Sequence, residues 1–254
     1  MGRIIVVANQ KGGVGKTTTT INLSASLASL GKQVLVIDMD PQGNATSGFG
    51  VDKNEVENSV YELLLGLKSV DECLMPKVFK NLSLIPSNIN LAAAEMELIE
   101  IERREYLLRD ILADISDRYD YIFVDCPPSL SLLTINSLCA ADSLIIPVQC
   151  EYYALEGLTQ LFQTVQLVRE RLNEKMVIEG LLFTMYDQRT NLSQEVVENV
   201  KENVDIYVFK SIIPRNIRLA EAPSYGLPVI EYDRKSAGAE AYMKLAKELI
   251  RKKK

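Results

Sequence analysis

The segment NQKGGVGKTT, residues 9–18, decides how this chain folds. It follows a short apolar run, RIIVV (residues 3–7), and opens a segment of helical period from about Thr17 to Leu30. Glycines allow backbone N–H groups to turn inward onto phosphate oxygens, and a helix N-terminus adds partial positive charge. Strand, glycine-rich loop and helix in this order predict a loop that wraps the phosphates of a nucleotide.

Two lysines distinguish this loop. Lys16 is predicted to reach the β- and γ-phosphates, and the hydroxyl of Thr17 to bind Mg²⁺. The standard pattern GxxxxGK[ST] requires glycine where this chain has Gln10, and a second lysine, Lys11, comes directly after it. A glycine-rich turn without function is the alternative, and the strand before, the helix after and the GKT inside disfavour it.

Carboxylates follow two other predicted strands. Asp125 ends YIFVD (residues 121–125), where it can hold the metal through water. Asp38 and Asp40 lie at the end of VLVID and just beyond it, which places them near the phosphate loop. Because the chain has no histidine, one of these two is expected to orient the attacking water. For Asp40, the alternative is a solvated turn residue.

Short apolar runs alternate with helical segments along the whole chain. Strands this apolar, separated by helices, predict a mainly parallel twisted sheet with helices on both faces, in a single domain over residues 1–254. Residues 91–115 form the longest helical pattern, predicted to pack on the sheet, with a partner-binding helix as the alternative. The predicted strands are residues 3–7, 33–38, 82–86, 121–125, 143–148 and 177–184.

Composition excludes several functions. The absence of histidine excludes an imidazole base, a Ser-His-Asp triad and a His-ligated metal. A net charge of −6 argues against a basic surface overall, so nucleic-acid binding requires a local patch. The four cysteines show no CxxC pairing, the N-terminus lacks a secretory signal, and no apolar run is long enough to span a membrane. A cytoplasmic location is therefore expected.

Four segments in the same order resemble the ParA/Soj family, of the deviant Walker A type. They are KGGVGKTT (11–18), VIDMDPQGNATSGFG (36–50), FVDCPPSLS (123–131) and IIPRNIRLAEAPSYGLP (212–228). The resemblance implies a nucleoid-associated ATPase that segregates a chromosome or plasmid, slow unless stimulated. ATP and Mg²⁺ would close a homodimer that binds double-stranded DNA without sequence preference, and a ParB-type protein would stimulate hydrolysis.

The resemblance also implies roles for single residues. Lys11 matches the lysine that crosses to the partner's phosphates, Gly12 the small residue that permits close approach, and Asp40 the residue that activates water. The predicted catalytic residues are Lys11, Lys16 and Asp40, and the predicted magnesium residues are Thr17, Asp38 and Asp125, the two acids through water. The predicted ATP-binding residues, with the last two framing the adenine, are Lys11, Gly12, Gly13, Val14, Gly15, Lys16, Thr17, Thr18, Pro214 and Asn216.

The DNA patch and the C-terminus leave alternatives open. Arg189 and Arg218 match positions associated with DNA binding in the family, and Arg215 is a basic neighbour. For each arginine taken alone, a solvated or ion-paired surface residue is the alternative. The C-terminal segment AYMKLAKELIRKKK, residues 241–254, is predicted to be a helix docked on the core with a solvated tail, and no membrane contact is expected. The competing functions are a membrane-bound positioning ATPase like MinD and a small-molecule ligase or kinase of the same superfamily.

Overall fold

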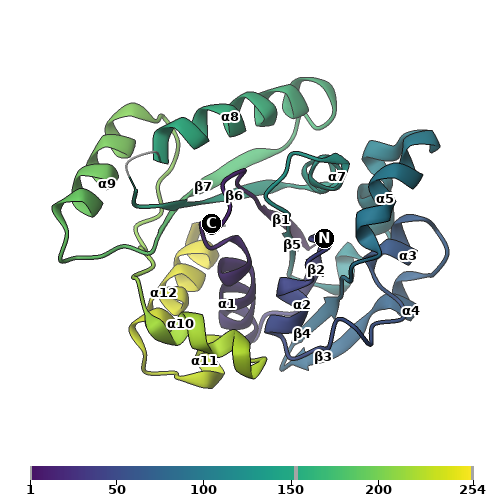
Figure 1. The fold of residues 1–254 in the computed structure, drawn as a ribbon, viewed down its shortest axis with the longest axis horizontal. Helices are drawn as coiled ribbons and strands as arrows, with labels where there is room; N and C mark the ends of the chain where they lie inside the picture. Colours follow the sequence, from purple (N-terminus) through teal and green to yellow (C-terminus); the bar gives the residue numbers. More distant parts are fainter. Residues whose placement is uncertain (1, 152–153, 253–254) are drawn as a thin grey trace.

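One sheet organises the protein. The computed structural model describes residues 2–151 and 154–252, and its sheet has the strand order β3-β4-β2-β5-β1-β6-β7 (Figure 1). All neighbouring strands are parallel except β3 and β4. The strands are β1 (Arg3–Val7), β2 (Val34–Asp38), β3 (Met75–Phe79), β4 (Leu82–Ile85), β5 (Tyr121–Asp125), β6 (Ser143–Gln149) and β7 (Val177–Thr184).

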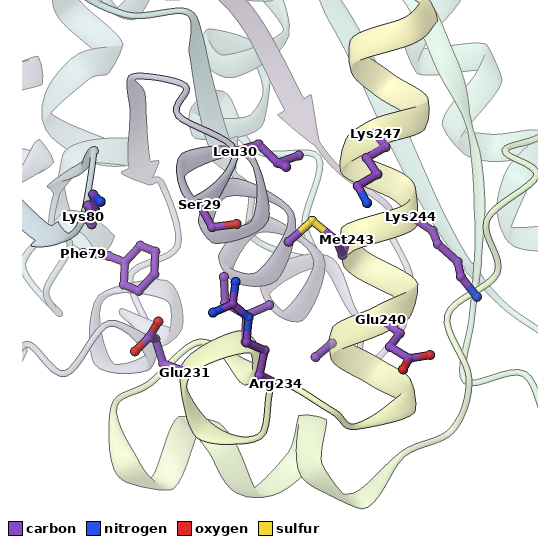
Figure 2. A pocket seen from close by; sticks show the side chains of 12 residues that line it. Ser29, Leu30, Phe79, Lys80, Glu231, Arg234, Glu240, Met243, Lys244 and Lys247 are labelled. Carbon is purple, nitrogen blue, oxygen red and sulfur yellow. The ribbon is translucent and has the colours of Figure 1, made fainter.

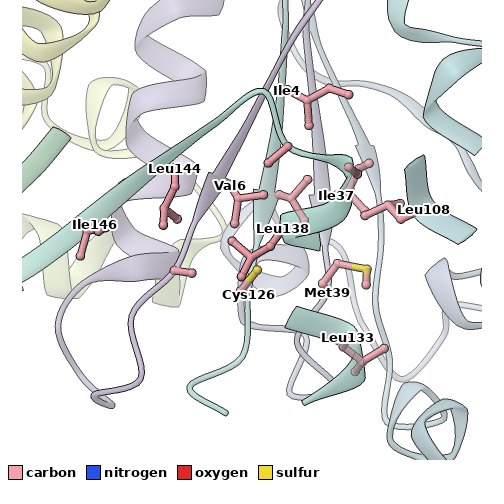
Figure 3. Packing of buried hydrophobic residues seen from close by; sticks show 14 of the residues in the cluster. Ile4, Val6, Ile37, Met39, Leu108, Cys126, Leu133, Leu138, Leu144 and Ile146 are labelled. Atoms are coloured by element: carbon pink, nitrogen blue, oxygen red, sulfur yellow. The ribbon is translucent and has the colours of Figure 1, made fainter. Parts of the chain in front are cut away.

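Helices cover both faces of this sheet, as the sequence predicts. In β1, Ile4 and Val6 face one buried cluster, shown in Figure 3, while Ile5 and Val7 face the other. Burial on both sides explains why the strands read as continuous apolar runs. The α-helices are α1 (Lys16–Ser29), α2 (Asn44–Gly48), α3 (Val60–Leu64), α4 (Val70–Cys73), α5 (Leu91–Glu97), α6 (Leu107–Ala113), α7 (Leu132–Ala140), α8 (Ala154–Arg171), α9 (Asn191–Asn203), α10 (Ile217–Glu221), α11 (Val229–Tyr232) and α12 (Ala237–Lys252).

The predicted strands are all present, but the edge strand β3 was not predicted. It contains Pro76, which cannot donate a ladder hydrogen bond and is therefore confined to sheet edges. Its residues are half-buried or exposed, so the apolar signal that marks the inner strands is missing.

The prediction of one helix over residues 91–115 is wrong. The chain leaves α5 through a 3₁₀ turn, becomes extended at Ile101 and takes a left-handed conformation at Arg103 (φ 56°) before α6 begins. α5 packs against α3, whereas α6 packs against α7. The spacing of apolar residues indicates which side of a segment is buried. It does not indicate that the two halves of this segment pack against different neighbours, which requires a break between them.

The C-terminal helix docks on the core, as predicted. α12 lies beside α1 (Figure 1), and its Tyr242, Leu245 and Leu249 are buried. The Tyr242 hydroxyl lies 3.1 Å from the Thr19 hydroxyl oxygen. The end of the predicted basic tail, residues 253–254, lies outside the described residues. Within the described ranges, no helix combines the length and apolarity needed to cross a bilayer.

Candidate nucleotide and magnesium site

The glycine-rich loop connects the C-terminal end of β1 to the first turn of α1. Gly13 and Gly15 have φ values of 74° and 87°, a left-handed conformation that glycine adopts without strain. No side chain caps the N-terminus of α1. Its first N–H groups therefore remain available to an anion, and the helix dipole favours negative charge there.

Side chains from outside the loop shape it. Asn9 donates to the Pro147 carbonyl oxygen at 2.7 Å and accepts from the Lys11 backbone N–H at 3.1 Å. From the end of β7, Thr184 donates its hydroxyl to the Val14 carbonyl oxygen at 2.8 Å. Sequence reasoning missed both residues. Asparagine two residues before a turn is a weak signal, and Thr184 lies 170 residues away from its partner.

Lys16 begins α1 at the centre of the loop. The residue is only 7% exposed, and its ammonium donates to the Lys11 carbonyl oxygen at 3.2 Å. Burial lowers the pKa of Lys16, and the nearby Asp125 carboxylate opposes that shift. Thr17 and Thr18 follow on the same first turn, half-buried. The structure therefore gathers the predicted phosphate contacts on one helix start.

The predicted metal carboxylates are neighbours in the sheet. Asp38 and Asp125 are paired across β2 and β5, and both are fully buried. Asp125 accepts from the hydroxyls of Thr17 at 2.7 Å and Thr20 at 2.8 Å. Burial raises the pKa of Asp125, and with the nearby Asp38 carboxylate acting in the same direction it reaches about 8. Thr17 and Asp125 thus present two adjacent oxygens of the kind that Mg²⁺ prefers.

Asp38 is directed toward the segment that follows β2. Its Oδ2 accepts from the Thr46 backbone N–H and hydroxyl, both at 2.8 Å, and its Oδ1 accepts from the Asp40 N–H at 3.1 Å. Burial raises the pKa of Asp38 to about 6. In this geometry Asp38 positions the loop that carries Asp40. Thr46 donates two of these hydrogen bonds, and nothing in the sequence indicated its part in the site.

Asp40 is 7% exposed, so its reading as a solvated turn residue is wrong. Its Oδ1 accepts from the Gln42 backbone N–H at 2.9 Å. Its Oδ2 accepts no hydrogen bond from the described part of the chain. One carboxylate oxygen is therefore anchored while the other is available to a water molecule.

The second lysine is held by its own chain. The Lys11 ammonium contacts Glu151 Oε2 at 2.7 Å, and both side chains are partly exposed. Next to it, Gly12 is exposed, and a Cβ added there would meet no atom within 4 Å. Sequence reasoning missed Glu151, which is 140 residues from Lys11.

The predicted adenine residues are connected to the loop through β7. Gly15 lies beside Thr184, and two residues further along the chain Tyr186 forms a parallel bridge with Pro214. Asn216 accepts the Arg218 N–H with its side-chain oxygen at 3.1 Å and so caps α10. Its amide NH₂ is the group that remains for a base.

The predicted DNA-contacting arginines differ in their surroundings. Arg189 is held by two hydrogen bonds to Asp187, at 2.9 and 2.7 Å. Arg218 pairs with Glu221 at 2.7 Å and Asp233 at 3.4 Å. Arg215 is exposed and shares a groove of about 860 Å³ with Arg189, Lys210 and Lys244. Arg218 does not line that groove.

The buried carboxylates predict a measurable effect on stability. Unfolding lowers the pKa of Asp125 from about 8 toward its ordinary value, so at this group the unfolded chain binds fewer protons, and the contribution of Asp125 to stability falls as pH rises from about 4 to 8. We expect Asp125→Asn to stabilise the nucleotide-free protein by about 1–3 kcal/mol at pH 8, and by much less at pH 5.

Urea unfolding at the two pH values measures this difference. Asp117→Asn, in the 3₁₀ turn Ser116–Arg118, is the control for an amide replacing a carboxylate elsewhere. A gap between wild type and Asp125→Asn that does not change with pH would contradict the argument.

Comparison with known proteins agrees with this geometry. A family model described as an AAA domain matches residues 2–178. The sporulation initiation inhibitor protein Soj of Bacillus subtilis is 55% identical over 249 residues, which cover 98% of each chain. The chromosome partitioning protein ParA of Myxococcus xanthus is 51% identical over 252 residues, covering 99% of this chain and 89% of its own.

A solved structure extends the comparison to a bound nucleotide. Cobyrinic acid a,c-diamide synthase from Mycobacterium smegmatis, with bound ADP and magnesium, is 38% identical and superposes with a TM-score of 0.88. The match covers 99% of this chain and 95% of that one. The loop, the paired carboxylates and identities above 50% over nearly the whole length lead to one conclusion: this chain belongs to the ParA/Soj family.

Proposed function

We propose that this protein is an ATP-dependent partitioning switch that hydrolyses ATP slowly and changes its dimer state with the nucleotide. One observation carries the proposal. A complete phosphate loop lies beside an exposed Gly12 and a second lysine that no buried contact holds in place. The name of the ParA relative from Myxococcus xanthus, a chromosome partitioning protein, supports the partitioning role.

The residues around the loop fit ATP and Mg²⁺. The uncapped N–H groups of α1 and the Lys16 ammonium would bind the phosphates, and the Thr17 hydroxyl with the Asp125 carboxylate, through water, would hold the cation. When bound, Mg²⁺ neutralises charge that develops on the phosphate oxygens. Asp38 would act at the metal through water or by holding the Asp40 loop, and the hydrogen bonds from Thr46 and Asp40 favour the second role.

Asp40 is the proposed water-orienting residue. Its anchored Oδ1 fixes the side chain, and its Oδ2 can accept a hydrogen bond from the water that attacks the γ-phosphate. Unstimulated turnover would resemble that of switch GTPases, roughly 10⁻⁴ to 10⁻² per second. A partner of the ParB type would then accelerate hydrolysis and end the ATP state.

Dimer formation would release Lys11 from Glu151. Exposed ion pairs contribute at most about 1 kcal/mol, so this contact is easily exchanged for the phosphates of a second subunit. Phosphate oxygens offer Lys11 stronger, charge-assisted hydrogen bonds. The ion pair therefore keeps Lys11 near the face where the partner would arrive without locking it.

We expect Gly12→Val to bind ATP and remain monomeric. The single chain tolerates the side chain because open space surrounds Gly12, whereas a partner's loop brought against it would clash. Size-exclusion chromatography with light scattering, with and without ATP, measures the dimer, and a fluorescent ATP analogue measures binding. Gly12→Ala is the graded control and should dimerise more weakly than wild type. An ATP-dependent dimer of the valine variant would refute the face-to-face arrangement.

DNA binding should require the dimer, because a chain of net charge −6 offers one local cluster of cations per subunit. If Arg189, Arg215 and Arg218 supply two or three phosphate contacts per subunit, log K should fall against log salt with a slope of about −4 to −5. Arg215→Ala should weaken binding to every duplex alike and reduce the slope by about 2, because each dimer loses two contacts.

The measurement is a salt titration of ATP-loaded protein on two unrelated duplexes. Lys201→Ala, on α9 outside this groove, is the control with the same change of charge. If Arg215→Ala and wild type bind DNA with equal affinity, other residues must make the DNA contact. A strong preference for one duplex would contradict phosphate recognition.

Two other functions make different predictions. A membrane-bound positioning ATPase would need an amphipathic anchor, but the apolar side of α12 is buried against α1; cosedimentation with vesicles in ATP tests this directly. A ligase is favoured only by the 38% identity to the synthase, well below the 55% identity to Soj. Turnover of about 10 per second without DNA or partner would support the ligase.

A further inference from the structure

The exposed side of α5 and the turns directly before and after it carry apolar side chains, here called the α5 stripe, that no described residue covers. Ile89, Met96 and Ile99 are 68%, 77% and 56% exposed. At about 100° per residue, the exposed Ala92, Ala93 and Met96 lie on one side of α5, while Ile89 lies in the turn before the helix and Ile99 in the 3₁₀ turn after it. The opposite side is the one buried in the core, through Leu91, Ala94 and Leu98. Several large apolar side chains exposed close together in the chain are a feature of interaction sites.

Acidic side chains accompany the stripe. Glu95 and Glu97 flank it, and Glu100 lies within it near Ile99. Glu97 accepts hydrogen bonds from the Tyr61 hydroxyl. In the described ranges, none of the three glutamates forms an ion pair with a lysine or arginine. The stripe is therefore suited to an apolar surface bordered by positive charge.

The same chain presents such a surface elsewhere. A groove of about 890 Å³ lies between the end of α1, the β3–β4 turn, α11 and α12 (Figure 2). Apolar side chains enter it from three of these elements: Leu30, Phe79 and Met243. The groove therefore offers apolar side chains against which the apolar side chains of the α5 stripe can pack.

The charges at the groove are also complementary. The groove is lined by three cationic side chains, those of Lys80, Arg234 and Lys247, and by the carboxylate of Glu231. None of the three cations forms an ion pair with another described residue. Glu240 and Lys244 also contribute to its wall, but Figure 2 shows their side chains directed to the other flank of α12.

We propose that the α5 stripe of one molecule docks into this groove of a second molecule. Figure 1 shows α5 and the α11–α12 region on opposite sides of the fold, so one chain cannot join them. Pairing two stripes with each other is disfavoured, because it would bring Glu95, Glu97 and Glu100 against their own copies. The groove supplies both the apolar contact and the opposite charge.

This contact is heterologous, since it joins two different surfaces. Each added molecule leaves one stripe and one groove free, so the arrangement extends head to tail. One helix side in one groove is at the small end of protein interfaces, which places it in the weak and transient class. The contact uses neither the phosphate loop nor Gly12, so it stands apart from the ATP dimer proposed above.

Sedimentation velocity of the full chain without nucleotide, at low salt and up to high micromolar concentration, tests the contact. For wild type we expect a sedimentation coefficient that rises with concentration and falls back when salt is added. Met96→Asp and Met243→Asp should each remain monomeric, because each places a charge at the centre of one half of the contact. The association constant should fall at least about tenfold.

Mixing the two variants gives the sharpest result. Met96→Asp retains its groove and Met243→Asp retains its stripe, so a 1:1 mixture should form a dimer that grows no further. Because Met243 is half-buried, the exposed pair Lys80→Glu/Lys247→Glu serves as a second groove variant, with circular dichroism to verify folding. It should associate with Glu95→Lys/Glu100→Lys, which restores opposite charges.

Two controls change the surface elsewhere. Leu167→Asp, at a side chain 51% exposed on α8, and Lys201→Glu on α9 should associate like wild type. Wild type that stays monomeric over the whole concentration range would overturn the proposal. So would a Met96→Asp variant that associates like wild type, or a mixture of the two methionine variants that remains monomeric.

Discussion

Lys16→Ala is expected to lower ATP hydrolysis at least about 10³-fold and to weaken nucleotide binding. The Lys16 ammonium is buried in the loop, and its contact inside the chain is the Lys11 carbonyl oxygen. Because this contact is to a carbonyl oxygen and not to a carboxylate, the ammonium is available to bind the nucleotide phosphates, where it neutralises part of their negative charge. Alanine removes that charge and leaves the glycine conformations of the loop unchanged.

The fold should tolerate this substitution. Burial already lowers the pKa of Lys16, so its removal eliminates a desolvated charge and the melting temperature should not fall. Phosphate release measures hydrolysis, and a fluorescent ATP analogue measures binding. Lys201→Ala, on α9 away from the loop, is the matched control. Hydrolysis by Lys16→Ala at the parental rate would show that the loop is not the catalytic site.

Asp40→Ala should reduce hydrolysis by about 10² to 10⁴-fold while ATP binding and the ATP-dependent dimer persist. The phosphate and metal contacts proposed for Lys16, Thr17 and Asp125 are untouched by this change. The dimer should therefore accumulate, because its ATP is no longer consumed. Size-exclusion chromatography with ATP, with phosphate release in parallel, detects the trapped state.

Asp40→Asn separates water activation from loop shape. The amide oxygen can still accept from the Gln42 N–H, as Oδ1 does in the native protein, but the side chain no longer carries a carboxylate for the water. We expect it to be as inactive as Asp40→Ala. An active Asn variant would mean that Asp40 only shapes the loop. A monomer with ATP would contradict the trapped dimer.

The sequence determined the architecture and the core of the candidate site. Strands buried on both faces must be apolar along their whole length, so RIIVV and YIFVD are visible without any structure. The loop is equally local, because Gly13, Gly15 and Lys16 act through backbone conformation and a helix start a few residues away. Interactions between residues that are close in the sequence can be predicted from the local sequence alone.

The tertiary structure decided what depends on residues far apart. The neighbouring carboxylates Asp38 and Asp125, the Lys11–Glu151 ion pair and the break between α5 and α6 all follow from how separate elements pack. The α5 stripe and the groove that complements it also appear only when exposure is known. Periodicity gives one buried side per helix, but whether the other side meets water or a second molecule is set by the surface that the rest of the chain leaves uncovered.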